Sequence, residues 1–309
     1  MTAAPAPSLK PAALSWPHLL LALAVMAVWG TNFVVIRVAL AHLPPLFLAL
    51  LRFTFAFLPM ALFVKRPAVP WRQLAAYGLL IGAGQFGLLF IAMKSDISPG
   101  LASLVIQTQV FFTIAMAVIA GGEKIRAFQW LALVLAVSGL GLILLHAGAA
   151  VTPLGLGLTL LASMSWAGGN WVARRGGVNM LAYVVWASVF AIPPLLLLSL
   201  IFDGPAAIVR GVREAEPATW AAVLWQSVGN TMFGYGVWGW LLSRYPAATV
   251  TPMALLVPVF GMSASAFFLS EALPVWKLAA AGLVMGGLAM NLFWPVAKRM
   301  VARRDRIES

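Results

Sequence analysis

The stretch PGLASLVIQTQVFFTIAMAVIAGGEK, residues 99–124, decides the fold. It opens with about 22 residues that carry no charge, and a helix of that length crosses a hydrocarbon layer of roughly 30 Å. Two amides, Gln107 and Gln109, nevertheless lie near its middle. Because a buried polar group is costly without a partner, the stretch predicts a membrane-spanning helix whose amides face other polar groups inside a bundle.

A second apolar stretch, residues 247–272, ends in the same way as the first. Its Glu271 lies 148 residues after Glu123, and the same offset separates Phe112 from Phe260. Direct identity between the halves is thin. The pattern favours a duplicated unit of five helices packed around these two stretches.

Composition places the chain in a membrane. Hydrophobic residues make up 62% of the 309 residues and charged residues 9%, against about 25% charged in an ordinary soluble domain. A β-barrel is excluded because its strands alternate over about ten residues, whereas these apolar runs are twice that length. The net charge of +12 resides mainly between the runs. It therefore indicates orientation in lipid rather than a nucleic-acid partner.

We expect an all-α polytopic membrane protein with ten transmembrane helices in two inverted five-helix repeats. The predicted divisions are a disordered N-terminal tail (1–15), the first repeat (16–148), the second repeat (149–296) and a basic cytoplasmic tail (297–309). The apolar runs are 17–41, 45–64, 72–93, 99–120, 127–146, 153–173, 180–202, 218–242, 247–270 and 275–295. The loop between the seventh and eighth runs, 203–217, is the longest.

Basic residues predict the orientation. With the N-terminus inside, 14 of the 20 Lys and Arg residues fall on the inner side, so both termini are expected in the cytoplasm. An odd number of helices per unit turns the second copy over in the membrane, which is the arrangement of many alternating-access transporters. The inner basic residues are Lys10, Lys65, Arg66, Arg72, Lys124, Arg126, Arg174, Arg175, Arg244, Lys298, Arg299, Arg303, Arg304 and Arg306.

Titratable groups are scarce at membrane depth. None of the eight acids or three histidines lies in the central third of a predicted helix, so a built-in proton relay is disfavoured. The absence of a Ser–His pair, an HExxH motif or a metal cluster argues against a membrane enzyme. Zero cysteines exclude disulfides and thiolate metal sites. We expect no cofactor and no metal.

Uncharged polar and aromatic side chains remain at depth, and their amide, hydroxyl and indole groups suit a small zwitterion with an apolar part. The alternative is that they bind helices together, each contributing about 1 kcal/mol. The predicted substrate-binding residues are Gln85, Gln107, Gln109, Asn230, Tyr235, Trp29, Asn32, Trp166, Asn170, Trp238 and Arg52.

Three further residues carry open alternatives. Arg52 either extends outward to the membrane surface or captures a substrate carboxylate at the cavity mouth, and the outward position is favoured. Pro252 and Pro258 should kink the ninth helix. The kink serves either as a hinge or as a static bend. Glycines of the tenth run suit packing within the chain or contact in a homodimer.

Several segments resemble the EamA family of the drug/metabolite transporter superfamily. They are VWGTNFVVIRVAL (28–40), LPPLFLALLRF (43–53), PGLASLVIQTQVFFT (99–113), the GGEK turn (121–124), SWAGGNWVARR (165–175) and the Gly-Tyr-Gly run at 234–236. The likeness covers essentially the whole chain. It implies ten helices, inverted repeats and a central cavity bordered mainly by the first, third, fourth, sixth, eighth and ninth helices.

The expected function is export of small amino-acid-type metabolites, such as O-acetylserine and cysteine, across a bacterial inner membrane by alternating access. The missing titratable group favours efflux down the solute gradient, or exchange. One alternative is an exporter of aromatic or drug-like compounds, which the aromatic content favours. Another is a membrane scaffold or sensor that moves no solute. The expected partners are the solute and membrane lipid.

Overall fold

The computed structural model describes residues 14–121, 125–148, 150–173 and 179–308. Within these ranges the chain is nearly all helical, and bridged extended backbone is limited to isolated pairings of Val151 with Ile97 and Gly148. Nearly all of the predicted disordered tail, the turn with Glu123, and the Arg174–Arg175 pair lie outside the described residues.

The helices of the first half are α1 (Trp16–Leu40), α2 (Pro45–Phe57), η1 (Met60–Leu62), α3 (Trp71–Leu79), η2 (Leu80–Gly87), α4 (Leu88–Ser95), α5 (Pro99–Val105), η3 (Ile106–Thr108), α6 (Gln109–Gly121) and α7 (Ala127–Leu145). Those of the second half are α8 (Pro153–Ala173), α9 (Met180–Leu198), η4 (Ser199–Asp203), α10 (Pro205–Glu214), α11 (Pro217–Trp225), η5 (Gln226–Tyr235), α12 (Gly236–Arg244), α13 (Ala247–Val250), η6 (Thr251–Leu255), α14 (Leu256–Leu269) and α15 (Val275–Glu308). Segments η1, η3 and η6 are 3₁₀ turns, whereas η2, η4 and η5 are π-helical.

Each predicted apolar run is mostly helical, with bounds that agree within a few residues, and only the run 45–64 is interrupted, by a turn at Leu58 and Pro59 between α2 and η1. In the described part of the chain, eight of them are long and apolar enough to cross a membrane. The other two, α8 and the series α11–η5–α12, are helical but more polar. The last helix is longer than predicted, because α15 continues through the basic tail as far as Glu308.

The segment predicted as the longest loop contains a helix of its own, α10. Gly204 before it has φ 81°, which a glycine adopts without strain, and Pro205 occupies the first turn, where its missing N–H costs nothing. Gly211 on α10 packs closely against the backbone carbonyl of His42. Because this short helix carries several charges, a search for apolar runs could not identify it.

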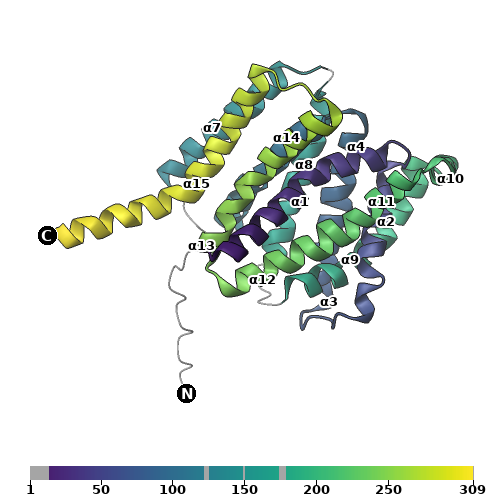
Figure 1. The fold of residues 1–309 in the computed structure, drawn as a ribbon, viewed down its shortest axis with the longest axis horizontal. Coiled ribbons are helices and arrows are strands. Elements are labelled where there is room, and N and C mark those ends of the chain that lie inside the picture. Colours follow the sequence, from purple (N-terminus) through teal and green to yellow (C-terminus); the bar gives the residue numbers. More distant parts are fainter. Residues whose placement is uncertain (1–13, 122–124, 149, 174–178, 309) are drawn as a thin grey trace.

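Glycines bring several helices into close contact. A Cβ on Gly78 would collide with the backbone of Ala187 in α9, and one on Gly82 would collide with Ala191. The two glycines thus give this part of the third helical run a smooth face for close packing against α9. On α15, Gly287 packs against the backbone of α7, whereas Gly282 has open space around it. Helices α7 and α15 lie together along one side of the bundle (Figure 1).

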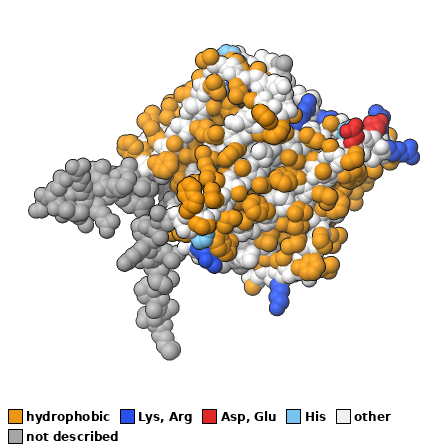
Figure 2. Space-filling view, viewed as in Figure 1, with side chains coloured by type: hydrophobic (Ala, Val, Ile, Leu, Met, Phe, Trp, Pro, Cys, Tyr) orange, Lys and Arg blue, Asp and Glu red, His pale blue; other side chains and the backbone are white. Residues whose placement is uncertain are grey.

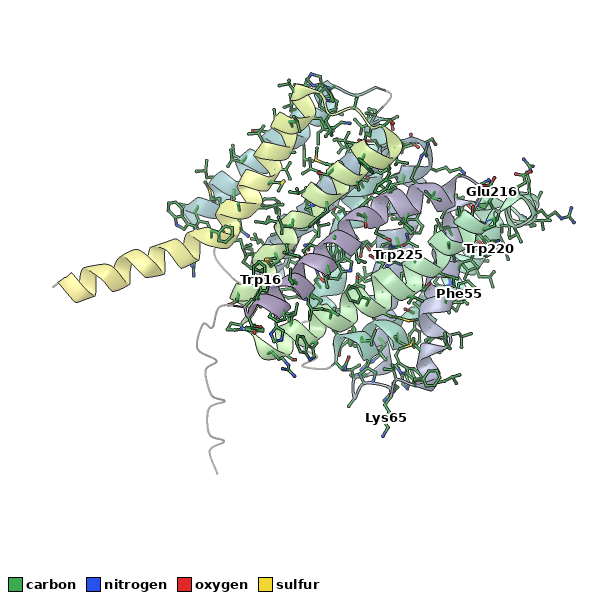
Figure 3. All side chains as sticks on the ribbon, viewed as in Figure 1. Trp16, Phe55, Lys65, Glu216, Trp220 and Trp225 are labelled. Atoms are coloured by element: carbon green, nitrogen blue, oxygen red, sulfur yellow. The ribbon has the colours of Figure 1, made fainter. Side chains whose placement is uncertain are left out.

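The bundle has two ends, which we name by what they carry. Helices α1, α3 and α9 begin at the N-terminal end, and α10 lies at the opposite, α10 end. Trp16 and Lys65 lie at the N-terminal end and Glu216 at the α10 end (Figure 3). On the face seen in Figure 2, hydrophobic side chains cover the area between the ends and charged groups lie at the periphery. This distribution suits a protein surrounded by lipid.

Candidate solute-binding cavity

A cavity of about 480 Å³ lies among the middle parts of the long helices. Small-molecule sites in proteins commonly enclose about 300–1,000 Å³. Residues of α1, η2, α6, α8, η5 and η6 all contribute to its wall. The wall therefore joins helices of both halves of the sequence.

Ten of the eleven predicted substrate-binding residues line this cavity. The exception is Arg52, which lies behind the wall. Neither Pro252 nor Pro258 lines it, although their neighbours Thr251 and Val257 do. The ten are Trp29, Asn32, Gln85, Gln107, Gln109, Trp166, Asn170, Asn230, Tyr235 and Trp238.

Much of the wall consists of irregular helix. Gln85 comes from π-helical η2 and Gln107 from the 3₁₀ turn η3. In the second half, Asn230 comes from π-helical η5 and Leu255 from the 3₁₀ turn η6. Such segments often mark functional sites, because they re-aim side chains and loosen the regular hydrogen bonding of the helix. Pro252 lies in η6, so the predicted break in the ninth helix takes the form of a 3₁₀ turn.

Aromatic rings form one side of the cavity. The ring of Trp29 lies 5.4 Å from that of Tyr235 and 5.4 Å from that of Trp238, measured between centroids. Its Nε1 donates to the backbone oxygen of Asn230 at 3.2 Å. The indole reaches this backbone because Gly234 has no side chain to block it. These contacts fix the rings as a rigid apolar surface.

Amides form another side and connect the two halves of the chain. Asn170 Nδ2 donates to Gln109 Oε1 at 3.1 Å, which joins α8 to α6. Thr113 Oγ1 donates to the backbone oxygen of Gln109 at 2.8 Å. These side chains are partly buried and line the cavity. They can offer hydrogen bonds to a solute while also holding helices together.

The favoured outward position of Arg52 is wrong. The side chain is 1% exposed and turns into the bundle. Its guanidinium donates to Gln226 Oε1, and to Thr231 Oγ1 at 3.3 Å. With the Asn230 amide oriented to satisfy both of its atoms, the Asn230 oxygen accepts from both terminal guanidinium nitrogens, at 3.1 and 2.6 Å. The hydropathy pattern could not reveal these partners, because they lie on η5, far from Arg52 in the sequence.

The sequence reasoning missed several polar residues at the site. Asn291 of α15 and Tyr77 of α3 line the cavity, and Gln226 touches Arg52 from behind it. An amide inside an apolar run is the signal that singled out Gln107, and it also applies to Asn291 and Gln226. The family resemblance implied six helices around the cavity. The tenth helical run, through Asn291, and the seventh, through Met180, also line it.

The cavity extends from the middle of the bundle toward the N-terminal end, where Met180 and Trp238 line it. The α10 end is tied by polar contacts. Glu271 accepts from Lys277 Nζ at 2.9 Å and from the backbone N–H of Gly100 at 3.0 Å. Arg37 Nη1 donates to the backbone oxygen of Lys94 at 2.6 Å. The cavity therefore lies on the N-terminal side of the region in which these polar contacts join the helices.

The chemistry of this cavity suits binding. Among its described lining residues there is no Asp, Glu, His, Lys or Arg. The described part of the chain also holds no group of three His, Cys, Asp or Glu side chains that could bind a metal. Amides, hydroxyls and aromatic faces can recognise a small polar solute.

Comparison with known proteins gives matches along most of the chain. The chain is 42% identical to a protein of Salmonella typhimurium (strain LT2) over 88% of this chain and 94% of that one. It is 39% identical to a protein of Escherichia coli (strain K12) over the same shares. Both are named "Probable amino-acid metabolite efflux pump". A third relative, from Streptantibioticus cattleyicolor, is named "Probable terminal-alkyne amino-acid exporter" and is 25% identical over 89% of this chain and 92% of that one.

One solved crystal structure has the same fold, with a TM-score of 0.58 over 92% of this chain and 98% of that one. Its sequence identity is 19%, so the likeness concerns the fold alone. The chain matches the sequence model of the EamA-like transporter family twice, over residues 16–145 and 153–293. With its membrane-spanning helices and central cavity, the protein is an integral membrane transporter rather than an enzyme, and it belongs to the EamA-like transporter family.

Proposed function

We propose that the protein exports small amino-acid-type metabolites across a bacterial inner membrane by alternating access. The observation that carries the proposal is the central cavity, whose described wall combines amides with aromatic rings and has no acidic residue. An amino acid presents a charged polar head and a side chain of variable polarity, and such a wall can accommodate both. The names of the relatives from Salmonella typhimurium and Escherichia coli support the same substrate class.

The proposed architecture is ten crossings in two inverted repeats. Four of the six irregular segments support it, because they match in kind and position between the halves, whereas η1 is a 3₁₀ turn and η4 is π-helical. The third and eighth helical runs each contain a π-helical segment, η2 and η5, and the fourth and ninth each contain a 3₁₀ turn, η3 and η6. In this scheme α8 and α11–η5–α12 also cross the membrane, and their polar residues face the cavity instead of lipid.

The N-terminal end of the bundle faces the cytoplasm in this proposal, with both chain termini on that side. The excess of basic residues at this end supports the orientation. The cavity then extends toward the cytoplasm, and the polar contacts at the α10 end close the outer side. During transport the polar contacts at the α10 end would break while the cytoplasmic side closes. In this proposal η6, with its Pro252, acts as the hinge.

Efflux down the solute gradient, or exchange, is the proposed mode. Proton-driven carriers commonly titrate a carboxylate or histidine inside the membrane. The described cavity wall offers neither. An aromatic or drug-like cation is a weaker candidate: the aromatic wall favours it, but the buried charge of Arg52 next to the wall repels it.

The test is solute flux in liposomes that contain the purified protein. Vesicles loaded with cysteine, O-acetylserine or phenylalanine should lose at least one of them faster than protein-free vesicles do. The double substitution Gln107→Ala and Gln109→Ala should slow that efflux at least ~tenfold, which corresponds to about 1.4 kcal/mol. The control is Gln129→Ala, a glutamine outside the cavity that bonds the backbone of Arg126, and its flux should stay within about twofold.

Two outcomes would overturn the proposal. If no amino acid leaves faster than from protein-free vesicles while a quaternary ammonium dye does, the drug-like alternative holds. If nothing moves in either set, the protein is better regarded as a scaffold or sensor.

A further inference from the structure

Arg52 carries a buried positive charge that no described acid neutralises. The structure pairs Asp96 with Thr152 and Glu271 with Lys277, and Asp203 accepts from the backbone N–H of Phe47. The remaining acids with described side chains, Glu214 and Glu216, are exposed. The guanidinium is instead bound to neutral oxygens of Gln226, Asn230 and Thr231. A buried charge held only by neutral groups is costly, and an anion at this place would lower that cost.

Four buried polar atoms of this cluster and of the adjoining cavity wall have no hydrogen-bond partner in the protein. Two are donors, Arg52 Nε and Gln226 Nε2, and two are acceptors, Asn32 Oδ1 and Gln85 Oε1. Buried polar atoms normally have hydrogen-bond partners, so four unpaired ones at the cluster and the adjoining wall call for an explanation. Their chemistry matches a zwitterion, because a carboxylate accepts hydrogen bonds and an ammonium group donates them.

This cluster adjoins the cavity. Asn32 and Asn230 contact the cluster and also belong to the cavity wall, and Gln85 belongs to the same wall. The ring of Phe86, which also lines the cavity, lies over the guanidinium, with the Arg52 Cζ atom 3.9 Å from the ring centre. Since aromatic faces attract cations weakly compared with a carboxylate, an anion entering from the cavity could displace the ring.

A buried amide behind the wall holds the Arg52 guanidinium in position. Gln226 is fully buried, and its Oε1 accepts from both Arg52 and Asn32. Asn230 turns its oxygen to Arg52, which polarises the amide and makes its N–H groups stronger donors. The Arg52 charge therefore acts directly through its own free N–H and indirectly through the polarised amide of Asn230.

We propose that Arg52, Gln226 and Asn230 bind the carboxylate of an α-amino acid, while the oxygens of Asn32 and Gln85 bind its ammonium group. This subsite rests on the proposed export function and narrows its substrate class to free α-amino acids. The side chain of the solute would then extend along the aromatic wall of Trp29 and Tyr235. Compounds that lack either charged group would be poor substrates.

The unaltered protein provides the first test, because it needs no substitution that might prevent folding. Liposomes containing it are loaded with cysteine or phenylalanine, with the corresponding carboxamides, or with the N-acetyl derivatives. Each amide keeps the ammonium group and lacks the carboxylate, and each N-acetyl compound does the reverse. After subtraction of leakage from protein-free vesicles, both derivatives should leave at least ~tenfold more slowly than the parent amino acid, a difference of about 1.4 kcal/mol.

A matched pair of arginine variants provides the second test. Arg52→Gln should remove the preference for the amino acid over its carboxamide. Arg37→Gln should preserve it, because Arg37 binds backbone carbonyls of Met93 and Lys94 at the α10 end and lies outside the cavity. Both variants are first checked by size-exclusion chromatography for a single folded species.

The outcomes separate this proposal from the one on which it rests. If amino acids and their carboxamides leave at equal rates, the carboxylate subsite is wrong while export stands. If the preference survives in Arg52→Gln, another group binds the carboxylate and the assignment fails. If no compound leaves faster than from protein-free vesicles, the export function itself fails.

Discussion

The glycines of this bundle differ in what surrounds them, and the difference can be measured one residue at a time. A Cβ at Gly78 would meet the backbone oxygen of Ala187, which cannot move without shifting α9. A Cβ at Gly282 of α15 would meet nothing within 4 Å. Both residues lie within helices, where alanine is intrinsically favoured over glycine by about 1 kcal/mol.

We therefore expect opposite effects from the same substitution. Gly78→Ala should lower the free energy of unfolding by about 1–3 kcal/mol, the usual cost of overpacking, whereas Gly282→Ala should leave it unchanged or raise it slightly. Tryptophan fluorescence during heating in detergent measures both melting temperatures. Equal melting temperatures would mean that the α3–α9 contact tolerates an extra methyl group.

For single residues, the sequence predicted which side chains line the cavity better than it predicted the partners of each side chain. Ten predicted residues line the cavity because an amide or indole inside an apolar run has few other low-cost positions. The position of Arg52 could not be predicted in this way. Its burial depends on Gln226 and Thr231 of η5, and nothing in the neighbourhood of residue 52 indicates that they lie beside it.

Among the elements, the start of α5 depends on a side chain from the other half of the chain. Glu271 follows α14, and its carboxylate accepts from Ser98 Oγ at 2.6 Å and from the N–H of Gly100 at 3.0 Å. A carboxylate at a helix N-terminus satisfies free N–H groups and is favoured by the helix dipole. Lys277 of α15, 2% exposed, completes the contact at 2.9 Å. One carboxylate thus joins α5, α14 and α15.

We expect Glu271→Gln to destabilise the protein strongly, because it leaves the Lys277 charge buried without a counter-charge. Breaking such a pair from one side costs about 3–5 kcal/mol. The double variant Glu271→Gln with Lys277→Met should recover much of that loss. Thermal unfolding of the two single variants and the double variant measures the coupling energy. If the two losses simply add, the charges are not coupled.

Helix positions were predictable because apolar runs and flanking prolines mark them. Pro45, Pro99 and Pro217 each begin a helix within a few residues of the predicted bound. The π and 3₁₀ segments were not predictable in the same way. The sequence of residues 80–87 predicts a regular apolar helix, whereas the segment is π-helical and packs against α8 and α9. Tertiary contacts decided these details.

For the whole molecule, the absence of cysteine makes the orientation simple to test. Ser243 at the N-terminal end and Glu214 on α10 are both exposed, and the unaltered chain has no thiol to give a background signal. In intact cells, a membrane-impermeant maleimide should label Glu214→Cys and spare Ser243→Cys. Inside-out vesicles should give the reverse. Labelling of both positions from the same side would rule out the proposed orientation.

The number of crossings is the feature of the whole molecule that the sequence predicted most directly, and the structure supports part of it. Eight helices of the described chain are long and apolar enough to span a membrane. The count of ten depends on α8 and α11–η5–α12, whose polar residues lower their hydropathy because they line the cavity. A solute pathway thus weakens the signal by which its own helices are recognised.

The isolated charge of Arg52 has an energetic consequence for the cell. Moving one elementary charge across the membrane voltage requires about 2.3 kcal/mol per 100 mV. A zwitterion brings no net charge to Arg52, so the loaded and empty carriers have the same total charge, and a complete cycle passes no current. In the proposed efflux down the solute gradient, the extent of excretion is then set by the concentration ratio of the solute, and an energised cell and a depolarised cell reach the same balance.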